Sequence, residues 1–178
     1  MVPSERKFTR FSKLTEPPRI DEIPDDGFCL SAFVVLSKPR APNRVLLGRL
    51  NKEGPWEHLA ALGPGRADRH SRGWTLPSSH LILYESPDEA ARRILTEQLG
   101  IPTQRLSEPK VFSEVWGEPR HWDIEFVFLG TRTDIHPTGC WSRLEFVDLT
   151  RTKKAEMSRW HEDVLAQVGR YVSDYQAP

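Results

Sequence analysis

A chain of 178 residues is long enough for one domain with a complete hydrophobic core, but too short for two large domains. Its 25 Lys and Arg residues balance its 25 Asp and Glu residues, which excludes the strong overall basic charge of a general nucleic-acid binder. The sequence has no run of about 20 apolar residues, and its N-terminus lacks an apolar signal segment. We therefore expect a cytoplasmic protein with no membrane partner.

Residues 1–26 combine charged side chains with scattered prolines and show no sustained hydrophobic periodicity. We expect an extended lead-in there, followed by a single folded domain over residues 27–175. Basic and aromatic residues such as Arg6, Lys7 and Phe8 would suit a phosphate backbone or an acidic protein surface. RNA and protein partners therefore stay open for this segment.

The folded part begins with two segments that predict a β-hairpin. The run FCLSAFVVLS, residues 28–37, is almost continuously apolar, as expected for a strand buried on both faces. After a turn that contains prolines, RVLLGRL, residues 44–50, is its expected antiparallel partner. The next segment, residues 51–73, is rich in Gly and Pro and predicts an irregular excursion with one short helical turn at its centre.

A helix with clear start and stop signals follows. Ser86 is a suitable N-cap, Pro87 suits the first helical position, and Glu89 completes a Ser-x-x-Glu capping box. Because Gly100 ends the helical pattern, we expect a helix over residues 87–99. Its buried stripe at helical spacing consists of Ala90, Ala91, Ile94, Leu95 and Leu99.

The rest of the sequence predicts three more strands and a closing helix. Strand-like runs occupy residues 111–116, 121–132 and 143–149, separated by Gly and Pro signals. Apolar residues at helical spacing indicate an amphipathic helix near the C-terminus: Met157, Trp160, Val164, Leu165, Val168 and Val172. This order of strands and helices predicts a mixed β-sheet covered by helices, an α/β or α+β sandwich.

The segment around the first predicted helix contains a spaced motif. In chain order its positions hold Ser79, Glu85, Arg93, Leu95, Glu97, Gly100 and Ile101. This spacing resembles the box of the Nudix superfamily, which reads Gly, five residues, Glu, seven residues, then Arg-Glu-U-x-Glu-Glu-x-Gly-U, where U is a bulky aliphatic residue. The match has no gap. The resemblance implies the Nudix α/β/α sandwich with a mixed β-sheet.

Several positions depart from the family pattern. Ser78 and Ser79 stand where the family has glycines, Ile94 replaces the Glu after the Arg, and Gln98 replaces the second of the paired acids. In the family, three carboxylates on this helix hold a divalent metal such as Mg²⁺ or Mn²⁺ against a diphosphate. Here Glu97 keeps its carboxylate, whereas Gln98 can offer only a neutral amide oxygen. The resemblance therefore implies a metal site that is weakened or lost.

The resemblance also assigns roles to other residues of the box. Arg93 and Glu85 match positions that brace the loop to the helix, through a bond between a guanidinium and a carboxylate. Ser78, Ser79 and His80 lie at the opening of the box, where they are candidates for contact with a phosphate. A single His in a loop is also a common surface residue, which is the simpler interpretation.

A missing carboxylate could be supplied from outside the box by Glu114, Asp123 or Glu125. In residues 121–128 polar and apolar side chains alternate, so one face of this strand is polar. We favour a solvated sheet face as the interpretation over an acid or base placed in a cleft. For the tryptophans, core packing is the default and base stacking by one of them the alternative: Trp56, Trp116, Trp122 and Trp141.

Three functional hypotheses follow. The leading one is a Nudix hydrolase-like protein that binds a nucleoside-diphosphate-linked or other diphosphate ligand, with weak or lost hydrolysis. The second is an active Mg²⁺-dependent diphosphate hydrolase that uses Glu97 and a carboxylate from outside the box. The third is a non-catalytic module that binds RNA or protein. Ligand choice should depend on residues 51–73 and 116–120, and exposed strand edges leave a homodimer open.

Overall fold

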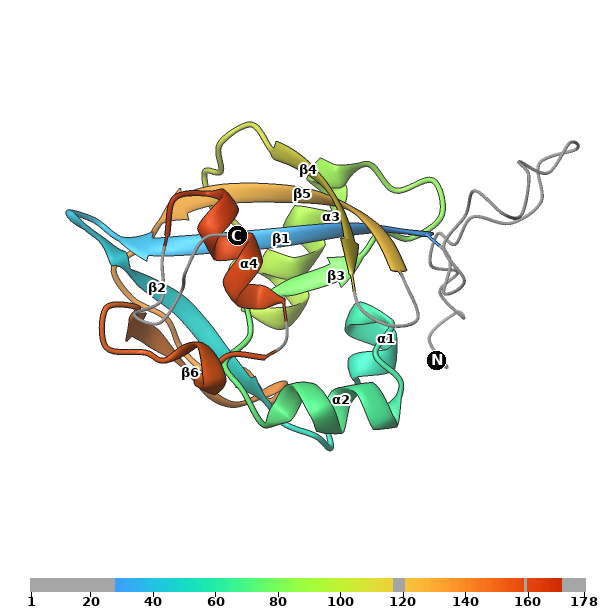
Figure 1. Ribbon diagram of the computed structural model, residues 1–178, viewed down its shortest axis with the longest axis horizontal. Coiled ribbons are helices and arrows are strands. Elements are labelled where there is room, and N and C mark those ends of the chain that lie inside the picture. Colours follow the sequence, from blue (N-terminus) through green and yellow to red (C-terminus); the bar gives the residue numbers. More distant parts are fainter. Residues whose placement is uncertain (1–27, 117–120, 159, 171–178) are drawn as a thin grey trace, which may run out of the picture.

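The computed structural model describes residues 28–116, 121–158 and 160–170. Within these residues the chain forms a six-stranded mixed sheet with the order β4-β5-β1-β2-β6, and the short β3 also pairs with β1 (Figure 1). The strands are β1 (Phe28–Lys38), β2 (Ala41–Leu50), β3 (Ser78–His80), β4 (Lys110–Trp116), β5 (His121–Thr131) and β6 (Trp141–Asp148). All the predicted strands are confirmed, and β3 is an addition to them.

The predicted hairpin exists, but its two strands separate beyond the turn. β1 and β2 pair antiparallel near the turn, where Ser37 lies opposite Val45. Beyond that point β2 runs along β6, and β1 runs parallel to β5. The separation leaves one edge of β1 open to β3, which pairs with it so that Ser31 lies opposite His80. The opening of the box is therefore part of the sheet.

Helices cover both faces of the sheet. Even-numbered apolar residues of β1 belong to the same core as α3 (Pro87–Arg93), and odd-numbered ones to the same core as α4 (His161–Gln167). This follows because successive side chains of a strand point to opposite faces. Figure 1 shows the two helices on opposite sides of the sheet. The predicted α/β/α sandwich with a mixed β-sheet is confirmed.

The segment over residues 51–73 differs from the prediction. Instead of an irregular excursion with one helical turn, it forms two short helices, α1 (Trp56–Ala60) and α2 (Pro64–Ser71). Pro64 occupies the first turn of α2, where its missing N–H is not needed, and Gly63 is the N-cap. Both helices contribute buried side chains to the core beside α3: Trp56, Leu59, Ala60 and Ala67. The Gly and Pro residues therefore mark helix ends.

The predicted capped helix is confirmed. The Ser86 hydroxyl accepts a hydrogen bond from the Glu89 N–H, and the Glu89 carboxylate accepts one from the Ser86 N–H at 2.8 Å. α3 continues directly into a π-helical turn, η2 (Ile94–Gln98), after which Gly100 adopts a φ of 66°. Single π-helical turns inside helices are frequent at functional sites. The turn lies at the box positions that hold metal in the family.

The C-terminal helix is shorter than predicted at its N-terminal end. α4 begins at His161, because Trp160 has a φ of 73° and so cannot continue a right-handed helix. The preceding segment contains a 3₁₀ turn, η3 (Lys154–Glu156). The predicted lead-in over residues 1–26 and the predicted helical position Val172 lie outside the described residues. In the part of the chain that the structure describes, no helix is long and apolar enough to cross a membrane.

Candidate functional site

Arg93 joins the box helix to the strand and loop that precede it. Its guanidinium donates through Nε and Nη2 to the Glu85 carboxylate at 2.7 and 2.8 Å. It also donates to the backbone oxygens of Leu59 and His80 and to the hydroxyl of Ser79. The side chains of the pair are only 9% and 11% exposed. This forked, largely buried contact fixes the geometry of the box loop.

The two substituted helix positions, Ile94 and Gln98, both face the protein interior. Ile94 is fully buried in the core beside α3, as the sequence predicts. Gln98 is 1% exposed, and its Nε2 donates to the backbone oxygen of Ser78 at 2.8 Å and to that of Leu59 at 3.5 Å. Its amide nitrogen thus ties η2 to the opening of the box. Its Oε1 accepts no hydrogen bond from any described residue.

The end of η2 is held by the segment that leads into β6. The backbone oxygen of Gln98 accepts hydrogen bonds from the Trp141 indole N–H and the Thr138 hydroxyl, both at 2.7 Å. The thiol of Cys140 lies 3.8 Å from the backbone oxygen of Glu97. The last carbonyl groups of a helix lack partners within it, so these donors satisfy them. Glu97, which is half-buried, is therefore carried by a firmly held helix end.

The residues at the opening of the box divide between the two faces of the sheet. Ser79 is buried on the α3 side, where its hydroxyl accepts a hydrogen bond from Arg93. Its neighbours in β3, Ser78 and His80, are half-buried on the opposite side. There, the Nδ1 of His80 lies 3.1 Å from the Ser31 hydroxyl. Polar side chains of the opening thus reach the α4 side of the sheet.

The carboxylates predicted as substitutes lie on that same side. Glu125 pairs with Ser31 across β5 and β1, and Glu114 pairs with Asp123 across β4 and β5, so each pair shares a face. The Gln167 amide of α4 donates to Glu114 at 2.9 Å. The structure therefore places these three acids on the α4 side of the sheet, whereas the box helix packs on the other side.

The polar face of β5 is buried, so the favoured interpretation of a solvated sheet face is wrong. Glu125 is 1% exposed and Asp123 is 9% exposed. Because β5 lies between β4 and β1, side chains on both of these strands limit the access of water. Burial raises the pKa of Asp123 to about 7, although a hydrogen bond with Ser31 opposes the shift. A carboxyl group with this pKa can exchange a proton at neutral pH.

The box does not fit the metal site that the Nudix resemblance implies. Ile94 contributes no ligand atom, and Gln98 uses its amide nitrogen as a donor to Ser78, so Glu97 is the remaining box carboxylate on this part of the helix. Mg²⁺ favours several hard oxygen ligands in near-octahedral geometry. Across the described ranges, no group of three or more His, Cys, Asp or Glu side chains is arranged to hold a metal ion.

The tryptophans have mixed environments. Trp56 and Trp141 are buried and pack edge to face, with ring centroids 4.9 Å apart, so both belong to the core. Trp122 is half-buried, and its indole N–H donates to the Ser113 hydroxyl at 2.9 Å. The side chain of Trp116 lies outside the described part of the structure. Base stacking by Trp122 stays a prediction.

Sequence reasoning missed a contact between two histidines, the half-buried His70 and the buried His161. The Nδ1 of His70 lies 2.6 Å from the Ser158 hydroxyl, and the Nδ1 of His161 accepts from the Leu76 N–H at 3.0 Å. The two imidazole rings are 5.7 Å apart. Burial, together with the charges of Arg66 and Arg69, lowers the pKa of His70 to about 4. Burial, together with the neighbouring His70, lowers the pKa of His161 to about 3. Neutral imidazoles thus connect α2 to α4, a long-range contact that no local pattern predicts.

Comparisons with known proteins agree with the geometry of the fold. No family model matches the sequence, and no curated protein matches it. Solved structures do match. A MutT Nudix hydrolase from Burkholderia pseudomallei has a TM-score of 0.57 and 17% identity, covering 79% of this chain and 98% of that one. The Nudix domain of Shewanella oneidensis NrtR, in complex with ADP ribose, has a TM-score of 0.56 and 15% identity, covering 80% and 87%.

A third match is a bifunctional NMN adenylyltransferase/ADP ribose pyrophosphatase from Francisella tularensis, complexed with AMP and a Mn ion. Its TM-score is 0.56 and its identity 16%, covering 83% of this chain and 42% of that one. These likenesses define the class of fold. The chain has the Nudix fold, which is the fold that the resemblance of the box implies.

Proposed function

We propose that this protein binds a nucleoside-diphosphate-linked or other diphosphate ligand in a Nudix-type site and hydrolyses it weakly or not at all. The observation that carries the proposal is the hydrogen bond from the Gln98 amide to the Ser78 backbone oxygen. In the family pattern this helix position holds a carboxylate. Here a neutral donor holds the helix to the opening of the box without a cation.

The loss of negative charge at the site is an argument that any catalysis is weak. Relative to the family pattern, the substitutions at positions 94 and 98 remove two negative charges from the helix. The Coulomb attraction for a divalent cation falls accordingly, and Ile94 fills its position with core packing instead. A cation held mainly by the phosphates of the ligand would bind more weakly than one held by three carboxylates. Transition-state stabilisation by the metal should decline with it.

The parts of the box that shape the loop are intact. The Arg93 and Glu85 pair has a forked geometry and joins the loop to α1 through the Leu59 oxygen. Ser78 and His80 lie at the opening of the box as polar side chains. Since two structural neighbours were solved with ADP ribose and with AMP, ligands of this class are the first to test on this chain.

One observation favours the alternative, an active Mg²⁺-dependent hydrolase. The Oε1 of Gln98 is buried and accepts no hydrogen bond from the described residues, and such an orphaned acceptor costs about 1–3 kcal/mol. Together with the neighbouring Glu97, it would offer a cation two oxygen ligands. A bound cation would supply neutralisation of phosphoryl charge and activation of water. Asp123, the carboxyl group outside the box whose pKa is raised, lies on the α4 side of the sheet and the box helix on the other, so this alternative rests on Glu97 and Gln98.

The test combines binding and turnover. The full chain would be titrated with ADP ribose and other nucleoside diphosphate derivatives by calorimetry, and hydrolysis measured with Mg²⁺ and with Mn²⁺. Glu97→Ala would be compared with Glu57→Ala, which removes an exposed carboxylate of α1. We expect binding by the wild type with turnover near background. Metal-dependent turnover that Glu97→Ala abolishes and Glu57→Ala preserves would overturn the proposal in favour of the alternative.

A gain-of-function variant sharpens the test. The substitution Gln98→Glu restores one family carboxylate and leaves the core residue Ile94 in place. The double substitution Ile94→Glu/Gln98→Glu restores both, although it puts a charge at a fully buried position. Turnover that appears in either variant would show that the ligand is bound in a hydrolysable position. If no ligand of the panel binds to the wild type, both hypotheses are wrong.

A further inference from the structure

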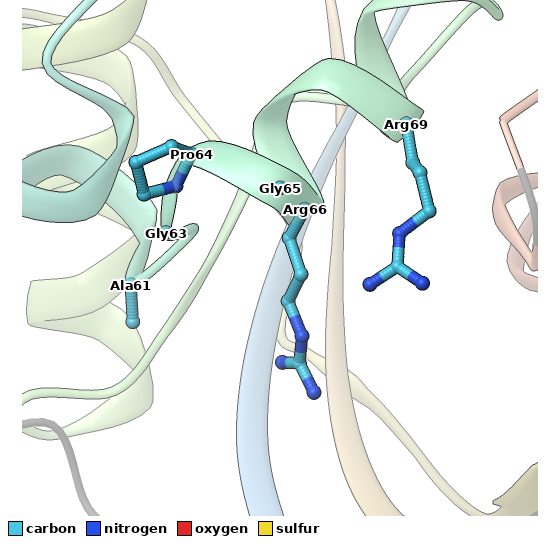
Figure 2. Close-up of a pocket in the computed structure, with 6 residues that line it drawn as sticks. All are labelled: Ala61, Gly63, Pro64, Gly65, Arg66 and Arg69. Carbon is cyan, nitrogen blue, oxygen red and sulfur yellow. The ribbon is translucent and has the colours of Figure 1, made fainter.

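The side of α2 carries an open hollow of about 690 Å³ that belongs to no box position. Small residues and two arginines line it: Ala61, Gly63, Pro64, Gly65, Arg66 and Arg69. Figure 2 shows the side chains of Arg66 and Arg69 leaving the same side of α2 and extending in the same direction. Residues three positions apart on a helix are neighbours on its surface. The two guanidinium groups can therefore act on one ligand.

The two arginines have no counter-charge among the described residues. Neither one forms an ion pair or a side-chain hydrogen bond with them, and both side chains are exposed. The third arginine of this segment, Arg72, is different, since it forms a salt bridge with Asp68 at 2.7 Å. Asp68 is the acidic residue of α2, and its ion pair is with Arg72 rather than with Arg66 or Arg69. The hollow thus keeps two uncompensated positive charges, which also help to lower the pKa of the adjacent His70.

The floor of the hollow lets a ligand approach the backbone. A Cβ atom added at Gly63 or Gly65 would meet nothing within 4 Å. The first helical hydrogen bonds of this turn are donated by Arg66 and Ala67 to the Gly63 oxygen, and Pro64 has no N–H, so the Gly65 N–H lies ahead of the helical pattern. A backbone N–H and two guanidinium groups on one open surface are suitable donors for an anion.

The hollow begins two residues along the chain from a contact of the box helix. Leu59 of α1 accepts hydrogen bonds from Arg93 and Gln98 through its backbone oxygen, and the hollow begins at Ala61 in the same chain segment. We propose that this hollow is an anion-binding site that takes a phosphate group of the ligand. This proposal rests on the proposed function. It restricts the ligand to molecules whose phosphate group can reach α2 while another part of the molecule lies in the box. Guanidinium groups recognise phosphate oxygens in a forked geometry.

The test uses inorganic pyrophosphate and ADP ribose as probes. The neutral variant Arg66→Gln/Arg69→Gln keeps two long side chains with good helix propensity. Arg72→Gln is the matched control, because it removes an arginine that already has a carboxylate partner. Calorimetry with pyrophosphate should show binding that weakens by about tenfold or more in the double variant, as expected for the loss of two charged donors, and that stays within about twofold in the control. Amide resonances of Gly63 and Gly65 should shift on titration.

A second variant guards against loss of structure. Gly65→Asp places a carboxylate in open space in the first turn of α2, where an acidic residue favours the helix. It should weaken pyrophosphate binding by repulsion while the circular dichroism spectrum stays unchanged. Pyrophosphate binding that is equal in the wild type and in both the Arg66→Gln/Arg69→Gln and Gly65→Asp variants would overturn the proposal.

The ADP ribose titrations separate this proposal from the proposed function. If ADP ribose binds equally well to the wild type and to the double arginine variant, the hollow plays no part in binding it, and the proposed function stands alone. If pyrophosphate binding depends on the two arginines but no nucleotide derivative binds, the anion site stands and the proposed function fails. Weaker binding of both probes in the double variant supports both.

Discussion

The buried Arg93 brace predicts a large loss of stability when its cation is removed. Arg93→Ala deletes five hydrogen bonds, two of them to Glu85. The Glu85 carboxylate, which is 11% exposed in the native pair, then keeps its hydrogen bond from the Ile82 N–H but loses its counter-charge. Breaking a buried ion pair by removing one partner costs about 3–5 kcal/mol. We therefore expect the free energy of unfolding at pH 7 to fall by about that amount.

The control is the exposed salt bridge on α2. Arg72 and Asp68 are 74% and 51% exposed, so Arg72→Ala should cost less than about 1 kcal/mol. Both variants would be unfolded in urea, and the slopes compared to check that they share the wild-type unfolding transition. Arg93→Lys keeps the positive charge but loses the forked hydrogen bonds to Glu85, so its loss of unfolding free energy should lie between those of Arg93→Ala and Arg72→Ala. A loss below about 1 kcal/mol for Arg93→Ala would refute the argument, because the brace would then contribute no more than a surface pair.

Three further predictions follow from buried groups. The folded state lowers the pKa of His161 from 6.5 to about 3, so the contribution of the neutral imidazole to stability is complete above pH 6.5. This contribution falls as the pH drops, by about 2 kcal/mol at pH 5. In urea unfolding, the stability of His161→Gln should therefore depend less on pH between pH 7 and 5 than that of the wild type. Asp123 has the opposite sign, since a pKa raised from 3.8 to about 7 costs stability as the pH rises through this window. The free energy of unfolding of Asp123→Asn should therefore rise relative to that of the wild type between pH 4 and 8, by up to about 4 kcal/mol. If the difference between the two proteins is the same at pH 4 and pH 8, the burial argument is wrong. A Cβ at Gly48 would lie 2.1 Å from the Trp141 ring, so Gly48→Ala should cost about 1–3 kcal/mol in thermal unfolding, whereas Gly139→Ala, where a Cβ meets nothing within 4 Å, should be nearly neutral.

The fold could be predicted from the sequence where local signals and the global structure agree. The Ser86 and Glu89 capping box is a contact between near neighbours, so the sequence is sufficient to locate the helix start. The continuous apolar run of residues 28–37 likewise predicts a strand buried on both faces. The two short helices of residues 51–73 could not be predicted from the sequence, because Gly and Pro occur both in loops and at helix ends. The helical structure of this segment depends on the burial of Trp56 and Ala67 in a core built from distant parts of the chain.

The site was predictable in spacing but not in orientation. The box spacing brings Arg93 and Glu85 to positions where the structure shows a salt bridge. The direction of the Gln98 amide could not be read from the sequence, because its partner is a backbone oxygen far along the chain. The burial of Asp123 likewise depends on the neighbours of β5 in the sheet rather than on the alternating pattern of the strand itself. Homodimer formation, and RNA or protein binding by residues 1–26, stay predictions.

The most direct test of the central claim concerns Gln98, whose amide stands where the family has a metal-binding carboxylate. The thermal unfolding of the wild type and of Gln98→Glu would be measured with and without Mg²⁺ or Mn²⁺. In the variant a buried carboxylate would face the backbone oxygens of Ser78 and Leu59, so we expect a loss of about 1–3 kcal/mol without metal. Added metal should restore stability in the variant by binding the folded state, and should leave the wild type unchanged. A wild type that Mg²⁺ alone stabilises by several degrees would contradict the account, because the native residues would then form a metal site.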